Sequence, residues 1–125
     1  FSAPLMAGND LRNMSPQTIE ILTKKEVLAI DQDKLRISAT RWMKYGELEI
    51  WLRPLNGGNL HFVLLTEAAT DQFNSDFNAT IKKYTVDDSF IVRDLWKHKE
   101  IGTTKENVVA TIPSHDVLML KHTKK

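Results

Sequence analysis

The sequence predicts a mainly β protein in which an antiparallel β-sandwich follows a short strand, loop and helix. The first observation is that the spacing of apolar residues changes from helical to two-residue near Ile37. The second is that six or more short apolar segments, separated by turn-rich stretches, occupy the following ~90 residues, as is typical of a sandwich. We therefore assign residues 1–35 to an N-terminal unit and residues 36–125 to a sandwich domain.

The N-terminal unit begins with a short apolar run, residues 1–7, which we interpret as a buried strand followed by turn-prone residues 8–10. Helical spacing then extends over Ser15–Asp33. Ser15 is a good N-cap, and Pro16 occupies the first helical position, where proline is tolerated. A polar break at Lys24 predicts either one helix that is kinked there or two short helices.

Strand spacing is clearest in residues 47–53. We expect one face of this strand, with Leu48, Ile50 and Leu52, to be buried. We expect the opposite face to be solvated, and it carries Glu47, Glu49, Trp51 and Arg53. Asn56-Gly57-Gly58-Asn59 predicts a hairpin turn into a second strand over residues 60–65. The further predicted strands are residues 77–83, 90–93, 108–112 and 117–122, with turns at residues 71–76 and 113–116.

Composition excludes several classes of protein. With 17 Lys and Arg against 16 Asp and Glu, the net charge is +1, so we expect no nucleic-acid partner and no anionic membrane surface. The absence of cysteine removes disulfides, thiolate nucleophiles and cysteine metal sites. No apolar run approaches the ~20 residues that cross a bilayer. Residues 1–8 lack both a cationic lead-in and an initiator Met, so we expect interior sequence there rather than a signal peptide.

The sequence predicts no catalytic residue, cofactor site or metal site. Neither glycine-rich phosphate-binding motif is present. The histidines lack the spacing of metal ligands, at positions His61, His98, His115 and His122. The run Ser114-His115-Asp116 favours a turn over a hydrolytic triad, whose members converge from separate segments. Glu47 and Glu49 lie about 6.6 Å apart along their strand, near the separation of a glycosidase carboxylate pair, but the clean alternation favours a solvated face.

Two segments match the acceptor pattern for N-glycosylation, Asn13-Met14-Ser15 and Asn78-Ala79-Thr80. Asn78 is the better candidate because it falls on the polar face of its predicted strand. Asn13 lies directly before the predicted helix entry at Ser15 and Pro16, which hinders modification.

Several motifs occur in a fixed order in the N-terminal unit: Ala3-Pro4-Leu5, Gly8-Asn9-Asp10-Leu11-Arg12, Ser15-Pro16 and Lys25-Glu26-Val27-Leu28-Ala29-Ile30-Asp31-Gln32-Asp33. This order resembles the end of the catalytic barrel in family 27 glycoside hydrolases, which are α-galactosidases and α-N-acetylgalactosaminidases. Later blocks resemble the C-terminal β-domain of that family: Glu49-Ile50-Trp51, Arg53-Pro54-Leu55, Val92-Arg93-Asp94-Leu95-Trp96 and Val117-Leu118-Met119-Leu120. The resemblance therefore spans nearly the whole chain.

The resemblance implies that residues 1–35 are the last strand and helix of an incomplete (β/α)8 barrel and that residues 36–125 are the sandwich that follows it. It departs at Lys34, where the family usually has proline, so the interdomain turn is less rigid. The family's two catalytic aspartates lie on earlier barrel strands, so no catalytic residue is carried over to this chain. Asp10 and Arg12 would lie near the catalytic face, where we expect them to support neighbouring loops through a charge-assisted hydrogen bond.

The resemblance implies a C-terminal fragment of a retaining glycosidase that releases terminal α-linked galactose from glycans or glycolipids, and we expect the fragment to be inactive alone. It also implies a lysosomal or secreted location, no cofactor, and a homodimer as one arrangement of the full-length enzyme. One alternative is a fragment of an α-N-acetylgalactosaminidase. Another is a stand-alone carbohydrate-binding or interaction module in which Trp51 or Trp96 stacks on sugar, although large aromatics usually anchor the core of a small sandwich.

Overall fold

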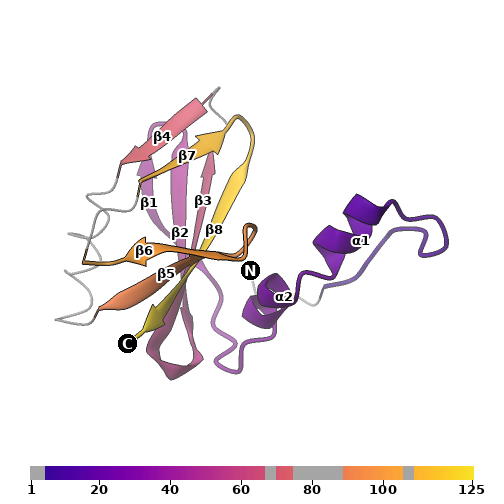
Figure 1. Cartoon of the computed structure of the whole chain (residues 1–125), viewed down its shortest axis with the longest axis horizontal. Helices are drawn as coiled ribbons and strands as arrows, with labels where there is room; N and C mark the ends of the chain where they lie inside the picture. Colours follow the sequence, from indigo (N-terminus) through magenta and orange to yellow (C-terminus); the bar gives the residue numbers. More distant parts are fainter. Residues whose placement is uncertain (1–4, 67–69, 75–88, 106–108) are drawn as a thin grey trace.

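The computed structural model describes residues 5–66, 70–74, 89–105 and 109–125 (Figure 1). Two short helices, α1 (Pro16–Leu22) and α2 (Lys25–Asp31), precede the strands. The described strands are β1 (Thr40–Tyr45), β2 (Leu48–Leu55), β3 (Asn59–Thr66), β4 (Thr70–Asn74), β5 (Phe90–Asp94), β6 (Lys99–Thr103), β7 (Val109–Pro113) and β8 (Val117–Lys124). Among these residues, no helix is long and apolar enough to span a membrane.

The strands form two antiparallel sheets, as expected for a sandwich. The larger sheet has the order β1-β2-β3-β8-β5-β6, and the smaller sheet pairs β4 with β7. The C-terminal strand β8 lies between β3 and β5 and pairs with both, so it is central to the larger sheet. The last strand of the chain therefore joins the β1–β3 half of this sheet to the β5–β6 half.

The predicted hairpin is confirmed between β2 and β3. These strands pair without a break from Leu48 opposite Thr66 to Leu55 opposite Asn59. A short 3-10 turn, Asn56–Gly58, connects them. Gly57 and Gly58 have φ angles of 77° and 75°, a left-handed conformation that costs glycine little because it lacks Cβ.

The sandwich core lies between the two sheets. The side chains of Ile50, Phe62 and Leu64 from the larger sheet pack in one cluster with Ile112 from β7. The remaining buried members of the cluster are Leu48, Val92 and Leu120. The predicted burial of Leu48 and Ile50 is thus confirmed, and Leu52 packs against the same cluster.

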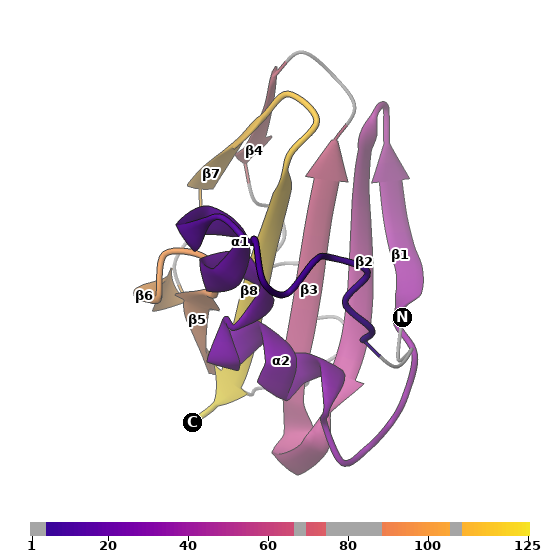
Figure 2. The same ribbon diagram turned by 90° about the vertical axis from the view of Figure 1, so that its right-hand side faces the viewer.

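The opposite face of the larger sheet is not solvated as predicted. Arg53 on this face is only 3% exposed, and the neighbouring Leu55 is 4% exposed. Figure 2 shows why: α2 lies across this side of β3 and β8. Alternation along a strand identifies the two faces, but it does not reveal that a segment more than twenty residues away covers the polar one.

The N-terminal prediction is right for the helices, and of the strand predicted over residues 1–7 only residues 5–7 lie within the described part of the chain. The Ser15 hydroxyl caps α1 by accepting a hydrogen bond from the Thr18 amide, and the break at Lys24 separates two helices. Residues 5–7 form no strand, and Leu5 is 63% exposed. A strand needs a hydrogen-bonded neighbour, and no described strand pairs with this segment.

Three described strands were not predicted. Residues 71–76 were expected to form a turn, but residues 70–74 form β4, which pairs with β7. Strands β1 and β6 lie at the two edges of the larger sheet. Edge strands are commonly polar, so they lack a clear apolar alternation. The predicted strand over residues 77–83 lies outside the described residues.

Candidate functional site

The candidate site lies where α2 meets the polar face of the larger sheet. We call this surface the helix face, and it carries Trp51, Arg53, His61, Val63 and Met119. These side chains come from β2, β3 and β8, whose register brings Val63 opposite both Trp51 and Met119. The arrangement therefore depends on the pairing of the β2–β3 hairpin with β8, which is more than fifty residues further along the chain.

An apolar cluster holds α2 on the sheet. Ile30 is 6% exposed and packs with Leu55 and Leu95, and Val27 and Met119 border them. Val27 and Ile30 are spaced three apart, so they lie on the same side of the helix. In contrast, α1 has no buried residue and projects away from the sheet (Figure 1).

A charged cluster joins the start of α2 to the β5–β6 half of the larger sheet. The two carboxylate oxygens of Glu26 accept hydrogen bonds from Nε and Nη2 of Arg93 at 2.7 and 2.8 Å. One of these oxygens also lies 2.7 Å from Nδ1 of His98. The Arg93 guanidinium, aided by His98, lowers the pKa of Glu26 to about 2 despite partial burial. We call Glu26, Arg93 and His98 the clasp.

Lys24 adds a second connection beside the clasp. Its ammonium donates to the backbone carbonyl of Trp96 at 2.9 Å and lies 5.5 Å from the centre of the indole ring. It also pairs with Glu20 at 3.3 Å. Trp96 is therefore part of the contact between the helices and the sandwich.

Glu47 and Glu49 do not form a catalytic pair. Glu47 lies in the turn before β2, and Glu49 lies on the strand. Glu49 accepts hydrogen bonds from the Trp51 indole at 3.0 Å, from Arg41 at 3.1 Å and from Lys44 at 3.2 Å. These donors, the indole first, lower the pKa of Glu49 and hold it ionised, which suits an ion pair rather than an acid catalyst.

The described residues contain no group of three His, Cys, Asp or Glu side chains that could hold a metal. His122 is fully buried and meets the Phe62 ring edge-on at 4.6 Å, and burial lowers its pKa to about 3. His115 is exposed in the predicted turn before β8. Asp116 in that turn accepts a hydrogen bond from the Val117 amide, so the run Ser114-His115-Asp116 forms no triad.

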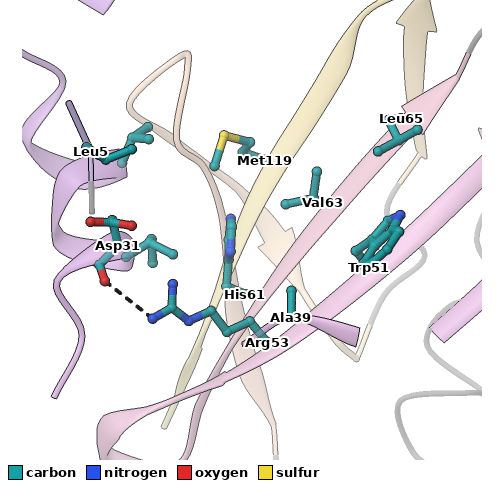
Figure 3. Close-up of a pocket in the computed structure, with 11 residues that line it drawn as sticks. Leu5, Asp31, Ala39, Trp51, Arg53, His61, Val63, Leu65 and Met119 are labelled. Atoms are coloured by element: carbon teal, nitrogen blue, oxygen red, sulfur yellow. Dashed lines mark hydrogen bonds between the residues drawn. The ribbon is translucent and has the colours of Figure 1, made fainter. Parts of the chain in front are cut away.

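A pocket of about 280 Å³ opens between α2 and the helix face (Figure 3). Arg53 and His61 lie in its wall, 3% and 4% exposed. Burial, together with the nearby Arg53 charge, lowers the pKa of His61 to about 4, so its ring is neutral at pH 7. Sequence reasoning missed this pair because no local pattern distinguishes a covered arginine from a solvated one.

The two loop-supporting candidates are paired with each other. The Asp10 carboxylate accepts from the Arg12 amide at 3.0 Å and from its Nε at 3.1 Å, and these bonds lower the pKa of Asp10. Both residues are exposed, so their support of neighbouring loops stays a prediction. Asn13 is exposed in the bend before α1, and Asn78 lies outside the described residues.

Comparison with known proteins gives a consistent set of relatives. Residues 45–122 match the family described as the alpha galactosidase C-terminal beta sandwich domain. The chain is 40% identical over 97% of its length to alpha-galactosidase A of Cellvibrio japonicus and 34% identical over 98% to alpha-galactosidase 2 of Arabidopsis thaliana. It spans about a third of each relative, 32% and 31% of their lengths.

A solved structure shows the same fold. The crystal structure of alpha-galactosidase I from Mortierella vinacea superimposes with a TM-score of 0.83 and 30% sequence identity. The similarity covers 97% of this chain and 32% of that one. The helices and the sandwich described above are therefore both included in the match.

Proposed function

This chain belongs to the family of alpha-galactosidase C-terminal β-sandwich domains, and from this premise we propose that it is the non-catalytic C-terminal part of an α-galactosidase. The observation that carries the proposal is the 40% identity to an alpha-galactosidase across 97% of the chain. In this proposal the parent enzyme releases terminal α-linked galactose from glycans or glycolipids. The hydrolytic carboxylates belong to the two thirds of the parent that this chain does not span.

The distribution of apolar surface supports a division at about residue 35. The sandwich domain, residues 36–125, has its own buried core. Residues 1–35 instead leave large apolar side chains uncovered, with exposures of 63% for Leu5, 71% for Leu11 and 57% for Ile21. A protein seldom exposes such side chains in one segment without a partner surface. We assign that segment to the last strand and helix of the parent's catalytic barrel, as its resemblance to the family implies.

The clasp and the apolar cluster give this chain a structural role in the parent. They fix α2 on the sandwich through Glu26, Arg93 and Ile30. If α2 belongs to the catalytic barrel, the same contacts orient the barrel against the sandwich. The chain would then stabilise the catalytic part without contacting substrate.

A hydrolysis assay tests whether this chain is catalytically inactive without the rest of the parent enzyme. The purified 125-residue chain is incubated with p-nitrophenyl α-galactoside, with the Cellvibrio japonicus alpha-galactosidase A as positive control. We expect no release of p-nitrophenol by the chain, because a barrel active site is assembled from the loops of several strands. Release above the buffer blank by the chain alone would overturn the proposal.

Two alternatives have separate tests. The parent could act on terminal α-N-acetylgalactosamine, and hydrolysis of the two p-nitrophenyl glycosides by the complete parent distinguishes the substrates. The chain could instead be a carbohydrate-binding module that stacks sugar on Trp51 or Trp96. Galactoside binding by the isolated chain that is lost in Trp51→Ala or Trp96→Ala, but kept in the exposed aromatic control Tyr45→Ala, would favour that module.

The compartment and the modification sites belong to the same proposal. A lysosomal or secreted location, and a homodimer of the parent, are what the family resemblance implies for this chain. A secretory route would expose Asn78 and Asn13 to glycosylation. Expression of the parent in eukaryotic cells, followed by glycosidase treatment and mass measurement of Asn78→Gln and Asn13→Gln, tests both the route and the sites.

A further inference from the structure

Two buried nitrogen atoms on the helix face have no hydrogen-bond partner among the residues that the structure describes. Nε of Arg53 and Nε2 of His61 are buried and unpaired. The one hydrogen bond described for Arg53 runs from Nη2 to the backbone carbonyl of Asp31, at 3.4 Å. A buried cation without good partners is costly, and a second unpaired donor beside it adds to that cost.

Both groups border a space that could hold a ligand. They lie in the wall of the pocket of about 280 Å³ between α2 and the sheet, and their side chains lie next to one another in Figure 3. The rest of the wall is mostly apolar, with Val27, Ile30 and Met119 among its residues. Pockets with apolar walls and a few convergent polar groups are typical of small-ligand sites.

The charge of the pocket specifies the polar end of such a ligand. Among the described side chains, no carboxylate lies within 4 Å of the Arg53 guanidinium. Asp31 lines the same pocket, but it offers Arg53 its backbone carbonyl rather than its carboxylate (Figure 3). The neutral His61 ring can carry its proton on Nε2 and donate it. A cation and a neutral donor side by side match the two oxygens of a carboxylate.

We propose that this pocket binds a carboxylate carried on a small apolar group, with Arg53 and His61 donating to the carboxylate oxygens and the apolar wall enclosing the rest. Binding of a free acid is independent of the proposed function, whereas binding of an acidic side chain from a longer form rests on it. The carboxylate has two sources with the same chemistry, a free aliphatic acid or an acidic side chain from a longer form of this protein. The exposed Leu5 also lies in the pocket wall.

Titration of the 125-residue chain with 4-methylpentanoate at pH 7, followed by NMR, tests the proposal. The neutral isostere 4-methylpentanamide is the ligand control. Arg53→Gln removes the proposed cation, and Arg41→Gln removes the same charge from strand β1 outside the pocket wall. We expect the acid to bind at least about tenfold more tightly than the amide. We expect Arg53→Gln to abolish that preference and Arg41→Gln to leave it unchanged.

A measurement on the unaltered chain keeps the proposal testable even if Arg53→Gln does not fold. A carboxylate beside His61 favours the charged imidazole, so saturation with the acid should raise the pKa of His61 from its value of about 4. Equal affinity for acid and amide, or a His61 ring whose signals do not respond to excess acid, would overturn the proposal.

The same titration on a longer form of the protein distinguishes the two sources. If the added acid no longer binds and the pKa of His61 is already raised, an acidic side chain of the protein occupies the site. If the acid binds as it does to the 125-residue chain, the site takes a free carboxylate. Loss of acid binding with the pKa of His61 still low would refute a carboxylate site in that protein.

Discussion

Glu26→Gln is the substitution that most directly tests how the helices are joined to the sandwich. Glu26 bonds to Arg93 and His98, which are respectively 67 and 72 residues away in sequence. Glutamine has nearly the same size and keeps one acceptor oxygen, so the substitution removes mainly the negative charge. Glu26 is not among the residues described in the sandwich core cluster, so the packing of that core should be preserved.

The expected magnitude comes from the pKa of Glu26. The clasp lowers it from 4.5 to about 2, and at ~1.4 kcal/mol per unit this corresponds to about 3 kcal/mol of stabilisation at neutral pH. The side chains of Arg93 and Glu26 are 33% and 29% exposed, so solvent screening reduces the expected loss to about 1–2 kcal/mol. Because the pKa is lowered on folding, this contribution is full above pH 4.5 and disappears as the pH falls through 2.

Urea unfolding at pH 7 and native-state amide exchange measure the loss. The change should be largest in the exchange of α2 amides, because the clasp fastens α2 rather than the sandwich core. Glu20→Gln is the matched control: Glu20 is 71% exposed and pairs only with Lys24 among the described residues, so we expect a loss below about 0.5 kcal/mol. In a double-mutant cycle, Glu26→Gln and Arg93→Gln should show a coupling of about 1–2 kcal/mol.

The reasoning fails if Glu26→Gln and Glu20→Gln have the same effect on unfolding and on α2 exchange. That result would mean that desolvation cancels the attraction between Glu26 and Arg93. An equal loss of protection in α2 and in the central strands would contradict a local role for the clasp.

Other predictions concern the buried residues and the two helices. Burial lowers the pKa of His61 to about 4, so its contribution to stability is full above pH 6.5 and is lost as the pH falls toward 4. His61→Gln should therefore reduce the loss of unfolding free energy between pH 7 and pH 5 by about 2 kcal/mol, measured by urea unfolding at both values. Leu64→Ala, at a fully buried core position, should cost about 2–5 kcal/mol in the same assay, and a loss under 1 kcal/mol would contradict tight packing there. Amides of α1, which has no buried residue, should exchange faster than those of α2, and equal protection of both helices would count against the apolar cluster and the clasp.

Local features of this protein could be predicted from neighbouring residues. The Ser15 cap, the break at Lys24 and the Asn56–Gly58 turn each depend on a few adjacent residues and their backbone preferences. The alternation of Leu48 and Ile50 likewise identified the side of β2 that faces the core. The resemblance to a glycosidase family was also present in the order of short motifs, and the match over residues 45–122 confirms it.

Residues 5–7, the described part of the strand predicted over residues 1–7, show that an apolar run alone does not form a strand. An apolar run is necessary for a buried strand, but the hydrogen bonds come from neighbouring strands, and residues 5–7 have none in the described part of the chain. β4 shows the opposite case. Its residues were predicted to form a turn, but they form a strand because they pair with β7.

The candidate site depends on contacts between residues far apart in the sequence. Arg53 occupies a position that looks solvent-facing in its own strand, yet it and His61 are buried on the side of the sheet that α2 covers. The pKa of Glu26 is likewise set by Arg93 and His98, which the sheet order brings to the start of α2. Burial and charge pairing depend on residues that are neighbours in space. The backbone preferences of a short segment can therefore predict helices, strands and turns, but they cannot predict which polar side chains become buried when these elements pack together.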